Sequence, residues 1–368
     1  MTQVLLQQLS NSDIKWMMDN SRQQQIAAGS VLIEQQSNVG YLYLVRQGTL
    51  SSSIKRNQNS TLARAFAELE DDTDLEQEIT RFDSGEILGE VSFLNCTPSA
   101  ITVKAKENSV VLALPSEKLL AKLRQDVEFA NRFYRAIAIL LLDRFERLVK
   151  AFKHSRNLKI PPLQNVAHLF GELKDSDVEW FKEHGHVEDK APGIKLIEAG
   201  RPLEYLYVVL RGRVSMFVQE GTGNPLDSMF RALEGYDHDS SPAIEIASLS
   251  RAEIIGEMGL IDAQLPIYTF KAAEYTQVLA IKKQKLTIVL QQNPAMGARF
   301  YRVIAMLLSA RLQGLIDRLG YGRSSYRVGQ ALSENSKYED EIGVNEMDNI
   351  FLGGVRFNRL LRSLRVVS

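Results

Sequence analysis

Residues 89–105, Gly-Glu-Val-Ser-Phe-Leu-Asn-Cys-Thr-Pro-Ser-Ala-Ile-Thr-Val-Lys-Ala, contain three short features in succession. Gly89-Glu90 opens a brief apolar turn, Thr97-Pro98 makes a bend, and a strand that alternates apolar and polar residues follows. A glycine before one helical turn leaves backbone N–H groups that point in one direction, which is a ready site for an anion. The carboxylate of Glu90 can accept hydrogen bonds from sugar hydroxyls. This stretch therefore predicts a pocket for a ribose phosphate.

The same pattern returns 167 residues later, from Gly256-Glu257 to Ala272. Earlier parts of the chain match at an offset of 164, for example Gly29 with Gly193 and Gly48 with Gly212. The offset of 167 then continues through the matching segments Arg132-Phe133-Tyr134-Arg135 and Arg299-Phe300-Tyr301-Arg302. Long matches at a nearly constant offset indicate a duplicated domain of roughly 150 residues, which is a usual domain size.

Composition and charge place the chain among ordinary globular proteins. Of its 368 residues 45% are hydrophobic and 24% are charged, and the net charge of −1 gives no general attraction to nucleic acid or membrane. The longest apolar run, Ala136 to Leu142, is too short to cross a bilayer, and no signal-peptide pattern follows Met1. Cys96 is the only cysteine, which excludes an internal disulfide and fits a reducing compartment. We therefore expect a cytoplasmic protein.

Within each copy the pattern predicts a helix, then short strands, then a long helix. In the first copy the leading helix is capped near Ser12-Asp13, and the turn residues Gly40 and Gly48 separate short strands. Such strands favour a small antiparallel barrel or roll. A long helix is expected from about Ser116 to Phe152. We expect its apolar stripe on one side and its arginines on the other, and these arginines are Arg132, Arg135, Arg144 and Arg147.

Two segments interrupt the strands and share no sequence with each other. Residues 57–79 are rich in acids and residues 220–242 in Gly, Asp and Pro, so both are expected to be exposed insertions. The predicted organisation is a first domain over 1–153, a linker over 154–164, a second domain over 165–320 and a tail over 321–368.

Each copy resembles a cyclic nucleotide-binding domain. The resemblance rests on Gly29, Glu34, Tyr41, Tyr43 and Gly48 before Gly89-Glu90, and on the equivalent residues of the second copy, Gly193, Glu198, Tyr205, Tyr207, Gly212 and Gly256-Glu257. It implies the α+β class, with two jelly-roll-like β-rolls, each flanked by helices and followed by a long C-terminal lid helix. The stretch that begins at Gly89 or Gly256 corresponds to the family's phosphate-binding cassette.

The resemblance implies a set of candidate ligand-binding residues. The cassette glutamates Glu90 and Glu257 inherit the role of binding the ribose 2′-hydroxyl. The full candidate set is Gly89, Glu90, Val91, Ser99 and Ala100 in the first copy and Gly256, Glu257, Met258, Ile267 and Tyr268 in the second. The implied ligand is cAMP or another cyclic nucleotide.

Both copies depart from the family at one position of the cassette. The family has an arginine just after the cassette proline, whereas this chain has Ser99 and Ile267. A charge-assisted hydrogen bond to a phosphate contributes roughly 1.5–3 kcal/mol. The loss of that arginine is therefore expected to weaken cyclic nucleotide binding about tenfold to a hundredfold. Ser99 can still donate one hydrogen bond, and Ile267 can donate none.

No motif predicts catalysis or a metal site. The five histidines lie outside any recognisable nucleophile or acid–base pattern, and no nucleotide-hydrolase, kinase or metalloprotease signature is present. His184 and His186 lack a surrounding cluster of ligand residues, so a solvated turn is expected there. We therefore expect a binding or regulatory protein that is not an enzyme and holds no metal.

The tail has an acidic part, Ser324 to Asp348, and a basic part, Val355 to Ser368. The basic part predicts a short amphipathic helix that can dock on a partner groove, lie on an anionic membrane surface, or fold back onto its own domain. The candidate docking residues are Arg356, Phe357, Arg359, Leu360, Leu361, Arg362, Leu364 and Arg365. Only 48 residues (368 − 320) follow Gly320, so sequence-specific DNA binding is not expected.

Two hypotheses remain from the sequence. One is a cyclic nucleotide sensor, arranged like the regulatory subunit of protein kinase A, whose lid helices move when ligand binds. The other is a scaffold in which two β-rolls with weak or lost nucleotide binding make protein–protein contacts. The missing arginines favour the scaffold, with protein partners and a location in the cytoplasm, at a membrane surface or in a larger complex. The lid helices are also candidates for the seam of a homodimer.

Overall fold

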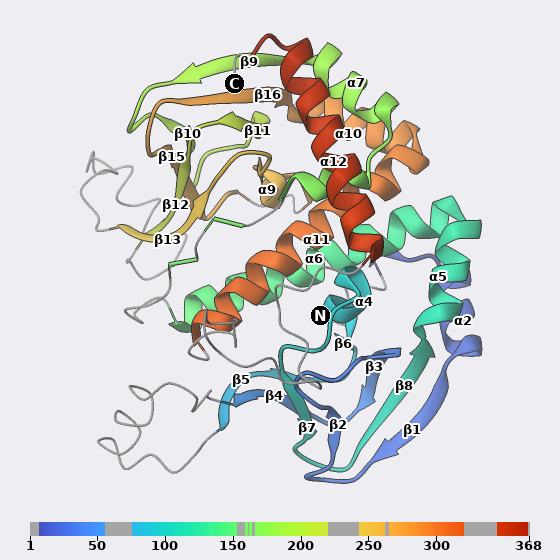
Figure 1. Cartoon of the computed structure of the whole chain (residues 1–368). Coiled ribbons are helices and arrows are strands. Elements are labelled where there is room, and N and C mark those ends of the chain that lie inside the picture. Colours follow the sequence, from blue (N-terminus) through green and yellow to red (C-terminus); the bar gives the residue numbers. More distant parts are fainter. Residues whose placement is uncertain are drawn as a thin grey trace, which may run out of the picture. The chain divides into compact units, whose positions relative to one another are not determined.

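The computed structural model describes residues 7–55, 76–152, 159–160, 162–163, 166–219, 243–261, 265–319 and 344–366 (Figure 1). Most of the two expected insertions, 56–75 and 220–242, lies outside these residues.

The chain forms two compact units that do not coincide with the two sequence copies. Unit 1 comprises Met1–Leu148, His168–Asp175 and Ile288–Arg356. Unit 2 comprises Val149–Ala167, Ser176–Thr287 and Phe357–Ser368. The β-roll of each copy lies in its own unit, but most of the C-terminal helix of the second copy belongs to unit 1.

Each β-roll consists of two four-stranded antiparallel sheets, with the strand orders β1-β8-β3-β6 and β2-β7-β4-β5 in the first copy. The second copy has the orders β14-β11-β16-β9 and β10-β15-β12-β13. This confirms the expected α+β fold of two β-rolls. The strands of the first copy are β1 Arg22–Ile26, β2 Val31–Ile33, β3 Tyr41–Gln47, β4 Leu50–Lys55, β5 Glu76–Phe82, β6 Ile87–Leu88, β7 Thr102–Ala105 and β8 Ser109–Pro115. Those of the second are β9 Gly185–Lys190, β10 Lys195–Ile197, β11 Tyr205–Arg211, β12 Val214–Gln219, β13 Ala243–Leu249, β14 Ile254–Ile255, β15 Tyr268–Ala272 and β16 Thr276–Lys282.

Alternating residues of these strands form the core of the first roll. Leu50, Val103 and Val111 are fully buried between its two sheets, and Phe82 and Leu88 pack beside them. Because successive side chains of a strand point to opposite faces, the short alternating runs of the sequence suffice to build this interior.

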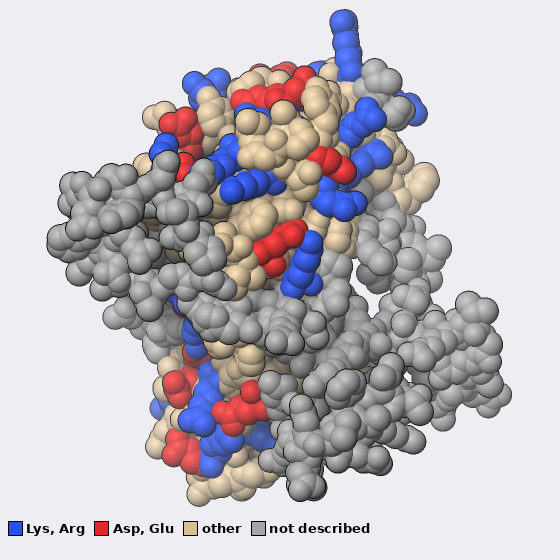
Figure 2. All heavy atoms as spheres, turned by 90° about the vertical axis from the view of Figure 1, so that its left-hand side faces the viewer, with Lys and Arg blue, Asp and Glu red and all other residues tan. Residues whose placement is uncertain are grey.

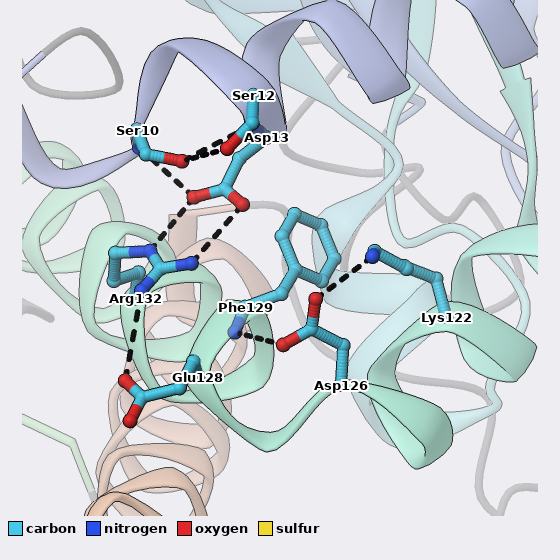
Figure 3. A network of polar contacts seen from close by, with 8 residues as sticks. All are labelled: Ser10, Ser12, Asp13, Lys122, Asp126, Glu128, Phe129 and Arg132. Carbon is cyan, nitrogen blue, oxygen red and sulfur yellow. Dashed lines mark hydrogen bonds and ion pairs between the residues drawn. The ribbon is translucent and has the colours of Figure 1, made fainter.

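The leading helix α2, Asn11–Asn20, begins with a capping box. The N-cap is Ser10, which is two residues before the expected position, and its hydroxyl accepts from the backbone N–H of Asp13. The carboxylate of Asp13 also receives two hydrogen bonds from the guanidinium of Arg132, at 2.7 and 3.1 Å (Figure 3). The cap of the first helix thereby ties α2 to the lid helix.

The expected long helix is in fact two helices, α5 Ser116–Gln125 and α6 Val127–Phe152. Asp126 between them is extended, and its carboxylate accepts from the backbone N–H of Phe129 at 2.9 Å and pairs with Lys122 at 2.8 Å (Figure 3). An aspartate that caps a new helix ends the previous one, because the cap residue leaves helical geometry. The second copy repeats the break between α10 Lys283–Gln292 and α11 Pro294–Leu319, where Asn293 accepts from Met296 N–H.

The lid helices α6 and α11 contact each other within unit 1. The guanidinium of Arg135 lies 5.9 Å from the ring centre of Tyr301, and that of Arg302 lies 5.9 Å from the ring centre of Tyr134. Arg135 is equivalent to Arg302, and Tyr134 is equivalent to Tyr301, so each contact is the counterpart of the other. The two helices therefore pack with approximate two-fold symmetry. The seam that we expected between two chains is thus formed by two helices of one chain, and a homodimer through it stays a prediction.

The C-terminal helix α12 runs over Val344–Ser363 and begins within the segment that we expected to be an acidic linker. Its apolar stripe does not face a partner: Phe357 is 1% exposed, and Leu360 and Leu361 are also buried in the chain. Arg356 pairs with Asp175 at 2.8 Å and donates to the carbonyl of Gly171. Of the three alternatives for this tail, namely a partner groove, a membrane surface and its own chain, the structure shows the helix folded back onto the chain.

The remaining docking candidates differ from the buried stripe. Arg359, Arg362 and Arg365 lie at exposed positions, and Leu364 is half-buried. The 3₁₀ helix η1 covers Val166–Gly171, and α7 covers Asp175–His184. In the part of the chain that the structure describes, no helix has the length and apolar character needed to span a bilayer.

Candidate ligand site in the first copy

The cassette of the first copy begins where the sequence placed it. Gly89 has a φ of +85° and is followed by the short helix α4, Glu90–Asn95. A Cβ atom at this position would lie 2.7 Å from the carbonyl oxygen of Tyr41. Both the left-handed backbone and this close approach require glycine.

Glu90 is buried (3% exposed) and forms an ion pair with the equally buried Arg144 of α6. The guanidinium also donates to the carbonyl oxygen of Ile87 and lies 5.0 Å from the ring centre of Phe82. We expected Arg144 on the exposed side of its helix, and the structure corrects this prediction. An arginine on the rim of the apolar stripe becomes buried here because a buried carboxylate needs a cation beside it.

This pair involves the carboxylate to which the resemblance assigned ribose binding, and that role of Glu90 stays a prediction. The carboxylate that was expected to accept a ribose hydroxyl already accepts a hydrogen bond from the guanidinium of Arg144. A ligand hydroxyl would have to share or replace that charge-assisted bond.

Ser99 occupies the place of the family's arginine, and its hydroxyl is used locally. It donates to the carbonyl oxygen of Ile101 at 2.9 Å, and the backbone N–H of Ile101 lies 3.3 Å from the same oxygen. The backbone N–H of Ser99 donates to Ser37 O. The hydroxyl therefore stabilises the turn that joins the cassette to β7.

A cavity of about 60 Å³ lies beside the cassette in unit 1. Small-molecule pockets usually measure roughly 300–1,000 Å³. The cavity brings together all five first-copy candidates with apolar residues of the roll and residues of both lid helices. The main lining residues are Ile33, Ile79, Thr80, Phe82, Val103, Gly89, Glu90, Val91, Ser99, Ala100, Arg144, Leu148, Leu312, Gln313 and Ile316.

The second copy's lid helix completes this cavity, which sequence reasoning missed. Leu312, Gln313 and Ile316 of α11 line it. The side-chain amide of Asn95, at the end of α4, donates to the hydroxyl of the buried Ser309 on α11 at 2.9 Å. The cassette of the first copy thus packs directly against a helix that lies more than 200 residues later in the chain.

The cassette of the second copy has the same backbone turn. Gly256 has a φ of +96° and precedes α9, Glu257–Ile261. Glu257 and Met258 are buried, and Tyr268 is buried in the sheet, whereas Ile267 is exposed.

The internal repeat contained a sign of Arg144 that we did not use. Arg144 and the buried Arg311 are equivalent at the offset of 167, as are Glu90 and Glu257. By contrast, Arg147 corresponds to Gly314. An acid and an arginine that both recur in the two copies are candidates for a pair. Arg132 and Arg135 recur as well, as Arg299 and Arg302, so recurrence by itself did not single out Arg144.

A second buried acid, Glu86, lies at the start of β6 near the same helix. Burial raises the pKa of Glu86 above its ordinary value, although the nearby guanidinium groups of Arg144 and Arg147 act in the opposite direction. Arg147 Nη2 lies 3.5 Å from Glu86 Oε1.

Cys96, the only cysteine of the sequence, is exposed at the end of α4. Among the described residues, no group of three or more His, Cys, Asp and Glu side chains is placed to hold a metal ion.

A family model of the cyclic nucleotide-binding domain matches residues 23–126 and 188–293, which together make up more than half of the chain. The chain therefore belongs to the cyclic nucleotide-binding domain family, with two tandem copies of the domain.

Curated relatives match only one copy's length of the chain. The cAMP-activated global transcriptional regulator CRP of Pasteurella multocida is 27% identical over 167 residues, which cover 44% of this chain and 69% of that protein. The patatin-like phospholipase domain-containing protein ZK370.4 of Caenorhabditis elegans is 26% identical over 174 residues. This match covers 45% of this chain but only 12% of the worm protein.

Among solved structures, the regulatory domain of Toxoplasma gondii PKA with cAMP is similar at 16% identity with a TM-score of 0.28. The match covers 78% of this chain and 87% of that one.

Proposed function

We propose that this chain is a non-enzymatic regulatory protein that acts through protein–protein contacts and whose first β-roll is held closed without a cyclic nucleotide. The observation that supports this proposal is the buried pair of Arg144 and Glu90. In this role Arg144 takes the place beside the cassette glutamate that the family's ligand takes with its ribose.

Binding of a cyclic nucleotide in the family's manner has a physical cost here. A ribose hydroxyl must share Glu90 with Arg144 or displace Arg144, and separating the partners of a buried ion pair costs about 3–5 kcal/mol when nothing replaces the lost partner. Neither Ser99 nor Ile267 supplies the cation that would recover this energy from the phosphate. The cavity of about 60 Å³ must also enlarge before it accepts a nucleotide. We propose further that the partners are proteins and that the chain acts in the cytoplasm, a location with which its single cysteine agrees.

A second candidate function, a cyclic nucleotide sensor, is favoured by one observation. Arg144 lines the cavity itself, so its guanidinium is a cation at which a phosphate can replace the carboxylate of Glu90. In this alternative Arg144 does the work of the arginine that the cassette lacks.

Titration calorimetry of the full chain with cAMP, cGMP and a cyclic dinucleotide separates the two functions. Under our proposal no heat of binding is expected up to millimolar ligand. Micromolar binding that is lost in Arg144→Gln and retained in Arg81→Gln, an exposed arginine of β5, would contradict the proposal and establish the sensor.

A further inference from the structure

The segment between the two copies is joined to the edge of the second roll by an isolated β-bridge. Ile160 forms a parallel bridge with Ala247 of the edge strand β13. Its N–H donates to the carbonyl of Ile246 at 2.8 Å, and its carbonyl accepts from Ser248 N–H at 3.1 Å. Ile160 lies in the segment that we expected to be the interdomain linker, and its side chain is only 2% exposed. The preceding residue, Lys159, pairs with Glu245 at 2.7 Å.

The first roll has an equivalent edge strand. β5 and β13 both contain seven residues, 167 apart, and both lie at the end of their sheet (Figure 1). Their registers agree as well, since Phe82 pairs with Leu50 as Leu249 pairs with Val214. The bulge lies after Ser52 in one roll and after the equivalent Met216 in the other.

This equivalence assigns the backbone groups of the β5 edge. Ile79 O and Arg81 N–H take the places of Ile246 O and Ser248 N–H, the two groups that hold Ile160 in the second roll. Between them Thr80 pairs with Ser52 of β4, and its carbonyl accepts from the Ser52 hydroxyl, so Thr80 faces the neighbouring strand. The outward groups on either side of Thr80 have the spacing that a parallel strand needs.

The side chains around the edge complete the match. Glu78 is equivalent to Glu245, the carboxylate that pairs with Lys159. In the first roll it pairs instead with Arg81 and Lys106, whose side chains are largely exposed and can move away at little cost. Ile79, Thr80 and Phe82 of the same strand line the cavity of unit 1. An apolar side chain placed at this edge therefore has space to bury into.

We propose that the β5 edge binds an extended peptide of a partner protein in which a basic residue precedes an aliphatic one. The peptide runs parallel to β5 and exchanges hydrogen bonds with Ile79 O and Arg81 N–H. Its basic residue pairs with Glu78, and its aliphatic residue packs at the cavity. Strand addition of this kind takes affinity from the main chain and specificity from the pockets for side chains. The inference rests on the proposed function in that it supplies a class of protein partner for the regulatory module.

The test uses the chain's own sequence as the probe. A fluorescein-labelled peptide Asn-Leu-Lys-Ile-Pro-Pro-Leu, the sequence of residues 157–163, is titrated with the full chain and followed by anisotropy. We expect saturable binding in the micromolar to sub-millimolar range. Arg81→Pro removes the N–H donor and is tolerated on an edge strand, and we expect it to weaken binding about tenfold or more. The matched variant Arg81→Ala keeps the donor and is expected to bind as the unaltered chain does.

A charge exchange tests the position of the basic residue. Glu78→Lys is expected to abolish binding of this peptide and to permit binding of a peptide in which the lysine is replaced by glutamate. A merely damaged fold would not produce this reversal.

Several outcomes would overturn the inference. One is a failure of the peptide to bind, and another is equal affinity of the Arg81→Pro and Arg81→Ala variants. Loss of binding in Ser248→Pro but not in Arg81→Pro would place the peptide on β13 instead. If the chain forms a concentration-dependent dimer that Arg81→Pro dissociates, the segment bound at the β5 edge is the linker of a second copy and not a partner peptide. All of these titrations are made without nucleotide, so their failure leaves the calorimetric test of the proposed function unaffected.

Discussion

Replacement of Arg144 by methionine is the most direct perturbation of the candidate site. The variant keeps an unbranched, mainly apolar stem, although a shorter one, and removes the charge that faces Glu90 and the donor to Ile87 O. Glu90 then remains buried without the cation that balances it. We expect a large loss of stability in unit 1, because a buried carboxylate is costly without a partner.

The magnitude follows from burial. Removal of one partner of a buried pair costs about 3–5 kcal/mol, whereas replacement of both partners by apolar side chains is often nearly neutral. With a urea slope of about 2 kcal/mol/M, a loss of about 4 kcal/mol lowers the unfolding midpoint by about 2 M. The double variant Arg144→Met with Glu90→Leu is expected to recover most of this loss.

The chain offers a reporter for each unit. Its two tryptophans are Trp16, which packs edge-on against Phe129 in unit 1, and Trp180, which stacks on His184 in unit 2. In a Trp180→Phe background, urea unfolding followed by tryptophan fluorescence reports unit 1. Arg81→Ala is the matched control, since the pair of Arg81 with Glu78 is exposed to solvent and its loss is expected to leave the urea midpoint nearly unchanged.

Two results would refute this reasoning. If Arg144→Met costs less than about 1 kcal/mol, the pair is not the buried, balanced contact that the structure describes. If the double variant is no more stable than the single one, the loss comes from packing and not from an unbalanced carboxylate.

Three further predictions concern the elements around the site. Burial alone would raise the pKa of Asp13, but hydrogen bonds from Arg132 and Ser10 hold it below its ordinary value. The stability that this shift contributes is therefore present above about pH 4 and is lost as the pH falls through the lower folded pKa. We expect Asp13→Asn to reduce the decrease of the urea midpoint that occurs below about pH 4. An unchanged decrease in this variant would contradict the prediction. Gly89→Ala should destabilise unit 1 more than Gly29→Ala. Both glycines have a positive φ, but only at Gly89 would the new Cβ atom lie 2.7 Å from a carbonyl oxygen. Equal thermal midpoints of the two variants would show that this contact relaxes. Phe357→Ala should lower the free energy of unfolding of unit 2 by about 3–5 kcal/mol, measured by Trp180 fluorescence during urea unfolding. The control is Phe351→Ala, because the side chain of Phe351 is 75% exposed. A loss no larger than that of the control would show that α12 does not pack as described.

The repeat and the local patterns were enough to predict the fold. Matches at a constant offset revealed two domains, and alternating runs between glycines indicated the β-rolls. Gly89 was recognisable because its conformation is imposed by its own backbone and by the adjacent turn. Such features depend on neighbours in sequence, so the sequence shows them directly. The break at Asp126 is also local, but it was missed because the apolar pattern continues through it.

The site depended on contacts between distant parts of the chain. The Arg144–Glu90 pair joins residues 54 apart, and the hydrogen bond from Asn95 to Ser309 joins residues 214 apart. The burial of Phe357 and the bridge from Ile160 to Ala247 also depend on segments that are distant in sequence. A helical pattern shows which residues share a face, but it does not show what that face will meet.

The sequence by itself thus determined the duplication, the two rolls, the glycine turns of the cassettes and the loss of the cassette arginines. Only the tertiary structure decided that another arginine fills the place beside Glu90, that a helix of the second copy closes the first copy's cavity, and that the tail packs on the chain itself. The physical reason is that backbone conformation is set largely by neighbouring residues. The partner of a buried charge or of an apolar face is set by whichever segment the folded chain brings beside it.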